Sequence, residues 1–259
     1  MSSASAIRVG VFGATGRMGT AACAAVAGDP ALELVAGVSR SGAGRVIEGV
    51  TVADRAEAMA EAGVEVAVDF TVLAAARTNL PWCAVHGIHA VVGTTGFTEV
   101  DVDALREAFK RSNCLIAPNF AIGAVLMMRF AELAAPWFET AEIIELHHDA
   151  KTDAPSGTAM MTAERMAAAS GEWAGDPTTN EVLTGARGGK GPGAIPVHSV
   201  RLRGLVAHQE VLFGTTGQSL TIRHDSYDRL SFMPGVLLAI KQVAGHPGVT
   251  VGLDAYLGM

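Results

Sequence analysis

Two histidines, a lysine and a glycine-containing turn lie within one short segment, from Glu145 to Ala159. The segment reads E-L-H-H-D-A-K-T-D-A-P-S-G-T-A. His147 can move a proton at neutral pH, because the pKa of histidine lies close to 7. The turn at Pro155 is expected to open a helix, whose first backbone N–H groups lack a partner in the helix and attract anions. With Lys151 beside that turn, the segment predicts a catalytic site for a small anionic substrate.

The elements around this segment must position its side chains. The apolar run Ala141–Leu146 predicts a buried strand that ends at the two histidines, and a helix is expected over Thr158–Ala169. Neighbouring residues of a strand point to opposite faces, so His147 and His148 are expected to have different roles. A packed or solvated histidine would be the simpler explanation of either. No metal site is expected, because no Cys, His or carboxylate cluster has ligand spacing.

The composition restricts the class of protein. A length of 259 residues, of which 49% are hydrophobic, is enough for one large domain or two small ones. The formal net charge of −7 argues against general nucleic-acid binding, and no apolar run reaches the roughly 20 residues of a membrane span. The three cysteines are odd in number and lack ligand spacing, which indicates buried thiols in a reducing compartment. With no signal peptide recognised, we expect a cytoplasmic protein.

The first half of the chain alternates apolar strands with helices. The strands are apolar on both faces, which is typical of a parallel sheet covered by helices on both sides. Repeated units of this kind predict a doubly wound α/β fold. The expected strands are Ile7–Gly13, Leu32–Val38, Val64–Phe70, Ile88–Val92 and Cys114–Ala117, and the expected helices are Arg17–Ala27, Arg55–Ala62, Leu73–His86 and Asp101–Arg111.

The second half has a different pattern. After a polar, glycine-rich segment from Ser170 to Gly193, strands predominate and are separated by short turns, so a mostly antiparallel sheet in an α+β domain is expected. We expect one domain over residues 1–118, completed by 229–259, and a second over residues 119–228. The expected helices are Ile122–Pro136, Thr158–Ala169 and Phe232–Val243, and the expected strands are Ala141–Leu146, Pro196–Leu202, Ala207–Phe213, Ser219–His224 and Val249–Leu253.

A glycine-rich turn follows the first expected strand. Gly13, Gly16 and Gly19 have the spacing G-x-x-G-x-x-G, a variant of the dinucleotide fingerprint, between a strand and a helix. Gly13 would allow a sharp turn, Gly16 the approach of a pyrophosphate, and Gly19 close packing of the helix on the strand. The motif predicts a Rossmann-type domain that binds a dinucleotide. A small-residue turn without a ligand would carry the same glycines.

The ends of the other expected strands indicate which dinucleotide is bound. Ser39 and Arg40 follow the second expected strand, where an acidic residue would bind the ribose 2′-OH of NAD. A hydroxyl and a guanidinium at this position suit the 2′-phosphate of NADP instead. NADPH is therefore expected to be accepted, the alternative being that Arg40 is a solvated loop residue. Ligands bind at the carboxyl ends of strands in open α/β sheets, so two further loops could line the nicotinamide, although ordinary turns would also explain them. These loops are Gly93-Thr94-Thr95-Gly96 and Ala117-Pro118-Asn119-Phe120, and Asp69-Phe70-Thr71 holds the same position with weaker chemistry.

Taken together, these motifs closely resemble those of the 4-hydroxy-tetrahydrodipicolinate reductase (dihydrodipicolinate reductase) family. The resemblance rests on the segment from Glu145 to Ala159 and on G-A-T-G-R-M-G, V-G-T-T-G-F and A-P-N-F-A-I-G. It covers nearly the whole chain. It implies NADH or NADPH as hydride donor and a cyclic dicarboxylate imine as substrate, in bacterial diaminopimelate and lysine synthesis. It also implies a homotetramer of two-domain subunits.

The resemblance implies a role for each matching position. His147 would be the proton donor, after hydride transfer to ring C4, and Lys151 a second donor or electrostatic stabiliser. His148 and the backbone of Gly157 and Thr158 would hold a substrate carboxylate. The expected cofactor contacts are Gly13, Ala14, Thr15, Gly16, Arg17 and Met18, with Ser39 and Arg40, with Gly93, Thr94 and Thr95, and with Ala117, Pro118, Asn119 and Phe120. Several family members have an acidic residue where this chain has Ser39.

Two other interpretations stay open. One is a different two-domain NAD(P) dehydrogenase, acting on aspartate semialdehyde or a sugar. An acyl-enzyme mechanism would need a cysteine nucleophile, and Cys114 lies inside an apolar strand. The other is a non-catalytic dinucleotide sensor, which would keep the glycine turn without needing His147 and Lys151. The arginines of the late strands, Arg201, Arg203 and Arg223, are interpreted as a solvated sheet face or a subunit contact.

Overall fold

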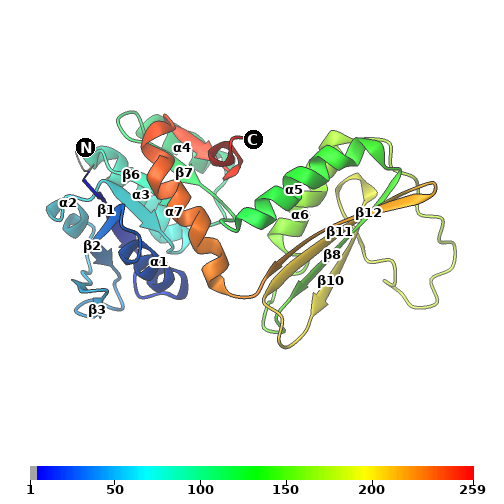
Figure 1. The fold of residues 1–259 in the computed structure, drawn as a ribbon, viewed down its shortest axis with the longest axis horizontal. Helices are drawn as coiled ribbons and strands as arrows, with labels where there is room; N and C mark the ends of the chain where they lie inside the picture. Colours follow the sequence, from blue (N-terminus) through cyan, green and yellow to red (C-terminus); the bar gives the residue numbers. More distant parts are fainter. Residues whose placement is uncertain (1–4) are drawn as a thin grey trace. The chain divides into compact units, whose positions relative to one another are not determined.

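The computed structural model describes residues 5–259, which divide into two compact units. The first unit runs to Phe120 and also contains Phe232–Met259, and the second is Ala121–Ser231. Each unit has its own sheet (Figure 1). Within the described residues, no helix combines the length and the apolar character that crossing a membrane requires.

A parallel sheet of six strands forms the centre of the first unit, which confirms the predicted doubly wound arrangement. The strand order is β13-β7-β6-β5-β1-β2, and every pair is parallel. The chain leaves β1 toward β2 on one side and returns to β5 on the other, so the carboxyl ends of β1 and β5 form a topological switch point. The strands are β1 (Ile7–Phe12), β2 (Leu32–Val38), β5 (Val66–Asp69), β6 (His89–Val92), β7 (Cys114–Ile116) and β13 (Val249–Val251).

Helices cover both faces of this sheet. Helix α1 packs beside α7, and α3 packs beside α4 (Figure 1). The apolar residues that the sequence pattern turns inward, such as Phe12, Leu80 and Phe109, lie in the core between helices and strands. The helices are α1 (Arg17–Ala27), α2 (Glu57–Glu61), α3 (Leu73–His86), α4 (Glu99–Ala108) and α7 (Met233–Gln242).

Two local features of this unit differ from the prediction. Helix α4 begins at Glu99 rather than Asp101, because Thr98 caps it: the Thr98 hydroxyl accepts from the Asp101 amide, and the Asp101 carboxylate accepts from the Thr98 amide. A short hairpin pairs β3 (Val46–Ile47) with β4 (Val50–Thr51). Strands of two residues are too short for hydrophobic periodicity to reveal.

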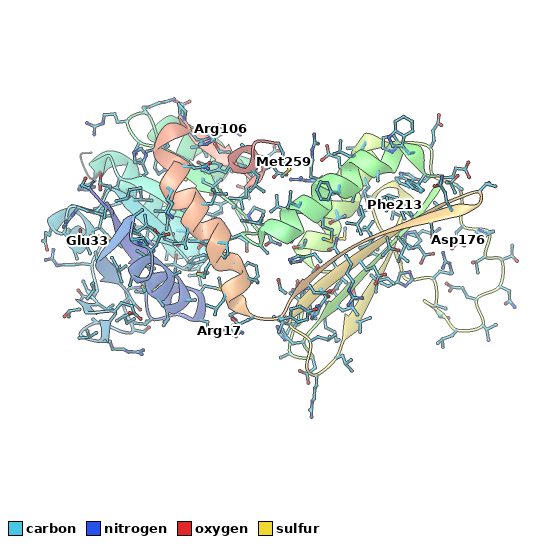
Figure 2. The ribbon with its side chains drawn as sticks, viewed as in Figure 1. Arg17, Glu33, Arg106, Asp176, Phe213 and Met259 are labelled. Carbon is cyan, nitrogen blue, oxygen red and sulfur yellow. The ribbon has the colours of Figure 1, made fainter. Side chains whose placement is uncertain are left out.

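A mixed sheet with two helices on one face forms the second unit (Figure 1). Its strand order is β12-β11-β8-β10-β9. Side chains fill the space between helices and sheet (Figure 2), where the ring of Phe213 lies 5.3 Å from that of Phe138, centroid to centroid. The elements are α5 (Ile122–Ala134), α6 (Gly157–Ala169), β8 (Thr140–His147), β9 (Gly189–Lys190), β10 (Pro196–Arg201), β11 (Ala207–Thr215) and β12 (Gln218–Ser226).

Strand pairing in this sheet was predicted only in part. Antiparallel pairing is correct for β11, which pairs with both β8 and β12. It is wrong for β10, which runs parallel to β8 instead of antiparallel to β11. Periodicity shows which residues of a strand are buried but does not identify its neighbour. As a result β8 is central, and Arg201 of β10 and Ala207 of β11 flank His147 in register.

Gly123 on α5 lies against His224 on β12. A Cβ at Gly123 would lie 2.5 Å from Cδ2 of the His224 ring. Alanine normally stabilises a helix over glycine by about 0.5–1 kcal/mol. Here we expect Gly123→Ala to destabilise the protein by about 1–3 kcal/mol, because the His224 ring or α5 must shift to relieve the close contact. Urea unfolding followed by tryptophan fluorescence measures the effect.

A second background tests the cause of this destabilisation. In a His224→Ala protein the space beside Gly123 is vacated, so Gly123→Ala should become neutral or stabilising there. An equal loss of stability in both backgrounds would show that the His224 ring is not responsible.

Candidate active site

Strand β8 ends at His147, the candidate proton donor. Ala141, Ile143 and Glu145 of this strand are buried on the face that the helices cover. His147 continues that alternation, and its side chain is only 15% exposed. His148 follows the strand and is exposed. The two adjacent histidines therefore have different surroundings, because one belongs to the buried face of the strand and the other to the loop.

Glu145 is fully buried beside His147, and its carboxylate contacts both His147 and Arg201. Its Oε2 atom lies 2.5 Å from Nδ1 of His147 and 2.8 Å from Nη1 of Arg201. Its Oε1 atom accepts from Nη2 of Arg201 at 2.8 Å and from the Ser156 amide at 3.1 Å. Burial pushes the pKa of Glu145 up, but hydrogen bonds from Arg201, Ser199 and His147 outweigh it, so the pKa lies below its usual value. Glu145 is therefore an ionised carboxylate with its charge compensated.

The surroundings of His147 control its charge. Burial lowers the pKa of His147, the Glu145 carboxylate raises it, and the nearby cations Lys151 and Arg201 lower it again, with a net decrease from the usual value. An ionised carboxylate can only accept hydrogen bonds, so a hydrogen bond between it and His147 requires a proton on Nδ1. Nε2 is then the nitrogen that gains and loses the second proton.

Arg201 was interpreted as part of a solvated sheet face or of a subunit contact, and the first of these interpretations is wrong. Its side chain is 19% exposed, and besides Glu145 it donates to the carbonyl oxygens of Val200 and Asp153. Arg203, which is 92% exposed and pairs with Asp149, does fit that interpretation. The sequence did contain a signal for the contact of Arg201 with Glu145. Glu145 lies in a strand predicted to be buried, and a buried glutamate needs a cationic partner.

Lys151 and the turn that opens α6 follow directly after β8. The Lys151 ammonium lies 2.8 Å from both carboxylate oxygens of Asp153. Ser156 caps α6 by accepting from the Ala159 amide. At Gly157 nothing lies within 4 Å of the position that a Cβ would take. The first turn of α6 is therefore open, and its amides and partial positive charge favour a carboxylate.

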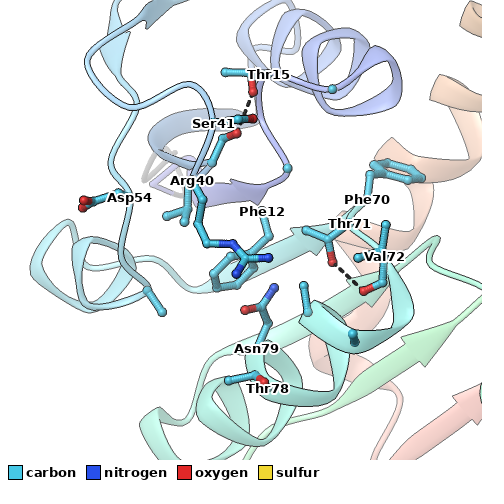
Figure 3. A pocket seen from close by; sticks show the side chains of 17 residues that line it. Phe12, Thr15, Arg40, Ser41, Asp54, Phe70, Thr71, Val72, Thr78 and Asn79 are labelled. Atoms are coloured by element: carbon cyan, nitrogen blue, oxygen red, sulfur yellow. Dashed lines mark hydrogen bonds between the residues drawn. The ribbon is translucent and has the colours of Figure 1, made fainter.

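In the first unit, the carboxyl ends of β1, β2 and β5 surround a cleft of about 720 Å³ (Figure 3). Arg40 extends its guanidinium into this cleft, on the side of Asn79 (Figure 3). The hydroxyl oxygens of Thr15 and Ser39 lie 2.6 Å apart, which joins the glycine turn to the end of β2. Five predicted residues line the cleft, namely Gly13, Thr15, Gly16, Ser39 and Arg40. The lining also includes residues that were not predicted, among them Phe12, Ser41, Asp54, Val72, Thr78 and Asn79.

The glycine turn in this cleft fits the pyrophosphate of a dinucleotide. Gly13 has a φ of 75°, and a Cβ there would lie 2.8 Å from the carbonyl oxygen of Phe70. A Cβ at Gly19 would lie 2.0 Å from the carbonyl oxygen of Gly13, so α1 packs directly on the turn. Among the described residues, no side chain accepts a hydrogen bond from the N-terminal amides of α1 as a cap. The first turn of α1 also has no acidic residue. The helix can therefore present its first amides to an anion.

The loops after β6 and β7 lie beside the cleft rather than in its lining. Thr94 donates to the Asp69 carboxylate at 2.9 Å, and Asp69 also accepts from Thr71 and from Asn79. Asp69, a weaker candidate than the residues of the other two loops, is buried and joins the ends of β5 and β6 to the cleft wall. The ring of Phe120 lies 6.0 Å from that of Phe70, which brings the end of β7 to the same edge.

The remaining predicted cofactor contacts differ in exposure. Ala14 and Ala117 are fully buried, so only their backbones are able to meet a ligand. Arg17, Thr95 and Pro118 are exposed, whereas Met18, Gly93 and Asn119 are partly buried.

Two family models match the chain, one for each unit. The model described as dihydrodipicolinate reductase, N-terminus, matches residues 7–120, and the model described as dihydrodipicolinate reductase, C-terminus, matches residues 123–257. The 4-hydroxy-tetrahydrodipicolinate reductase of Nocardia farcinica is 53% identical, and that of Streptomyces coelicolor is 48% identical. Each comparison covers 98% of this chain and 99% of the relative.

Solved structures show the same similarity. A dipicolinate-bound dihydrodipicolinate reductase from Paenisporosarcina sp. TG-14 has a TM-score of 0.87 and 42% identity, covering 96% of this chain and 99% of that one. An amine dehydrogenase from Mycobacterium smegmatis has a TM-score of 0.65, with 96% of this chain and 95% of that chain covered. At 14% identity, this second similarity shows the fold alone.

Proposed function

This chain belongs to the dihydrodipicolinate reductase family, and we propose that it reduces 4-hydroxy-tetrahydrodipicolinate, via dihydrodipicolinate, to tetrahydrodipicolinate with NAD(P)H. This reaction belongs to diaminopimelate and lysine synthesis. One observation carries the proposal. His147, with its Nδ1 bonded to a buried carboxylate, lies in the same short segment as Lys151 and the open first turn of α6.

We propose that the second unit binds the dicarboxylate. Gly157 and Thr158 present the first turn of α6 to one carboxylate, and His148 and Lys151 provide further contacts. Lys151 exchanges Asp153 for the substrate, since that ion pair is partly exposed and weak. Holding both carboxylates fixes ring C4 in place, and such orientation lowers the barrier by several kcal/mol (roughly 7–11 in the best cases).

His147 completes the proposed reaction. The substrate loses water to give a conjugated imine, and bound NAD(P)H supplies the hydride that ring C4 accepts. Lys151 and the first turn of α6 stabilise the negative charge that develops toward the ring nitrogen. The imidazolium of His147 donates its Nε2 proton to the resulting enamine, which leaves a neutral imidazole whose Nδ1–H still faces Glu145.

Turnover with the substrate itself tests the proposed function. Oxidation of NADPH and NADH is followed with enzymatically generated 4-hydroxy-tetrahydrodipicolinate, and with aspartate semialdehyde and sugars as comparison substrates. We expect turnover with the first substrate only. Burial raises the pKa of the Cys114 thiol, which argues against the acyl-enzyme alternative. Absence of turnover with either cofactor would overturn the proposal.

Arg40 is expected to favour NADPH. Replacement by aspartate removes a charge-assisted contact to the 2′-phosphate and adds repulsion, so KM for NADPH should rise about 10- to 100-fold while KM for NADH changes little. Steady-state kinetics with both cofactors measures the ratio. Arg45→Asp is the matched control, because Arg45 is exposed outside the cleft lining and undergoes the same change of charge. Equal effects of both variants on NADPH would assign the result to long-range charge.

We propose further that the protein is a cytoplasmic homotetramer. On the sheet of the second unit, Ile144, Leu146 and Leu212 alternate with the buried residues of their strands and are only partly buried. A sheet face that leaves apolar side chains partly exposed is a typical subunit interface. Cys23, Cys83 and Cys114 are free thiols, which supports a reducing compartment. Light scattering tests the assembly, and the mass of a monomer would contradict it.

A further inference from the structure

We propose that Glu145 is a positioning residue that sets the tautomer of His147 and holds the turn that opens α6, with Arg201 keeping it ionised. The inference rests on the proposed function, because it concerns the proton donor and the carboxylate seat of that reaction. It adds two residues that touch neither cofactor nor substrate.

The two carboxylate oxygens of Glu145 serve two parts of the site. Oε2 accepts from Nδ1 of His147 at 2.5 Å, and Oε1 accepts from the Ser156 amide at 3.1 Å. The first contact fixes the imidazole ring and leaves Nε2 as the nitrogen that transfers a proton. The second fixes the residue that caps α6. One buried side chain therefore sets the position of the acid relative to the anion-binding turn.

Arg201 links this pair to the loop that carries Lys151. Its guanidinium binds both oxygens of Glu145 at 2.8 Å, in the bidentate geometry that is the strongest for this pair. Nη2 also donates to the Asp153 carbonyl oxygen at 2.6 Å. Because β10 is parallel to β8, Arg201 is in register with His147 and its side chain reaches back to Glu145. The pair joins β8, β10, the loop and the start of α6.

The charged groups around His147 come from three segments. Glu145 lies on β8, Arg201 on β10, and Lys151 with Asp153 in the loop before α6. The neighbour on β11 is Ala207, which carries no charge. Without the charge of Glu145, two cations and burial would act on the imidazolium with little opposition. The glutamate therefore opposes the lowering of the His147 pKa by burial and by the two cations.

The same strand offers a matched control. Glu142 also binds an arginine and a histidine, Arg187 at 2.5 Å and His198 at 2.8 Å. It stands three positions before Glu145, so it points to the opposite face of β8. Glu142→Gln, like Glu145→Gln, removes a negative charge from β8 that contacts an arginine and a histidine. Unlike Glu145, Glu142 does not contact His147.

The tautomer of His147 in the unaltered protein provides the first test. Nitrogen-15 NMR of histidine-labelled protein, titrated without substrate and assigned with His147→Gln, reports which ring nitrogen is protonated in the neutral imidazole. We expect the proton on Nδ1. A proton on Nε2 would overturn the proposal. The result does not depend on turnover, so failure of the proposed reaction with an Nδ1–H tautomer would leave this inference standing.

Glu145→Gln provides the second test. The pKa of His147 should fall by about 1 to 2 pH units, because an opposite charge within hydrogen-bond reach is lost. The midpoint of the pH profile of kcat/KM should move to lower pH with it, and kcat at neutral pH should fall about 10- to 100-fold. KM for NADPH should stay unchanged, and Glu142→Gln should leave the pKa of His147 unaltered. An unshifted pKa of His147 in the folded Glu145→Gln variant would refute the proposal. If that variant does not fold, the tautomer of His147 in the unaltered protein tests the proposal by itself.

Discussion

Replacement of His147 by glutamine is expected to lower kcat by about 100- to 10,000-fold, the range that a positioned general acid contributes. The residue ends β8 with its ring held by Glu145, whereas the neighbouring histidine, His148, lies exposed in the loop. KM for NADPH should stay close to its original value, because the cofactor cleft lies in the other unit. Steady-state kinetics with saturating NADPH measures both constants.

His198→Gln is the matched control for this variant. His198 also bonds to a strand glutamate, but on the opposite face of β8. Its replacement should leave kcat near the original value. Similar losses in the two variants would mean that a general disturbance of the sheet, rather than loss of the acid, lowers activity.

The direction in which kcat/KM changes with pH can also be predicted. The net effect of burial, Glu145 and the neighbouring cations holds the pKa of His147 below its usual value. The imidazolium is the proposed donor, so kcat/KM should be largest at acidic pH and fall as pH rises through the pKa of His147 in the free enzyme. The midpoint should lie below that of an ordinary histidine. This descent should disappear in His147→Gln, and its persistence there would assign it to another group.

Replacement of Lys151 by methionine is expected to lower kcat/KM for the dicarboxylate by about 100- to 1,000-fold. Methionine keeps the apolar stem but removes the charge that is proposed to stabilise both the bound carboxylate and the developing charge on the ring. The loss should appear in kcat as well as in KM, because the second of these interactions arises only in the transition state. A change confined to KM would reduce Lys151 to a binding residue.

Asp153→Asn tests the ion pair that Lys151 makes in the absence of substrate. Both carboxylate oxygens of Asp153 lie 2.8 Å from the Lys151 ammonium, and the carboxylate is largely exposed. A pair of this kind is worth at most about 1 kcal/mol, so KM for the substrate should fall no more than about fivefold. An increase in KM would show that Asp153 helps to orient Lys151 instead of competing for it.

The sequence by itself determined the elements of this protein and the short segments that depend on them. The parallel sheet, the glycine turn and the succession of β8, loop and α6 all follow from local signals: apolar periodicity, glycine spacing and a helix-opening turn. His147, Lys151 and Gly157 fall within a few residues of one another, so proximity along the chain already brought them together. Arg40 could be placed in the cleft because strand ends meet at one edge of a parallel sheet.

Only the tertiary structure decided which distant residues support that site. Glu145 and Arg201 are 56 positions apart, and they meet because β10 pairs with β8 in parallel, against the expected antiparallel order. Asp69 and Thr94 meet because β5 and β6 are neighbours in the sheet. Such pairings depend on strand order, which is set by the packing free energy of the whole sheet rather than by any local pattern. For the same reason, the sequence could single out His147 as the candidate proton donor, while the contact of Glu145 with Arg201 was recognised only in the fold.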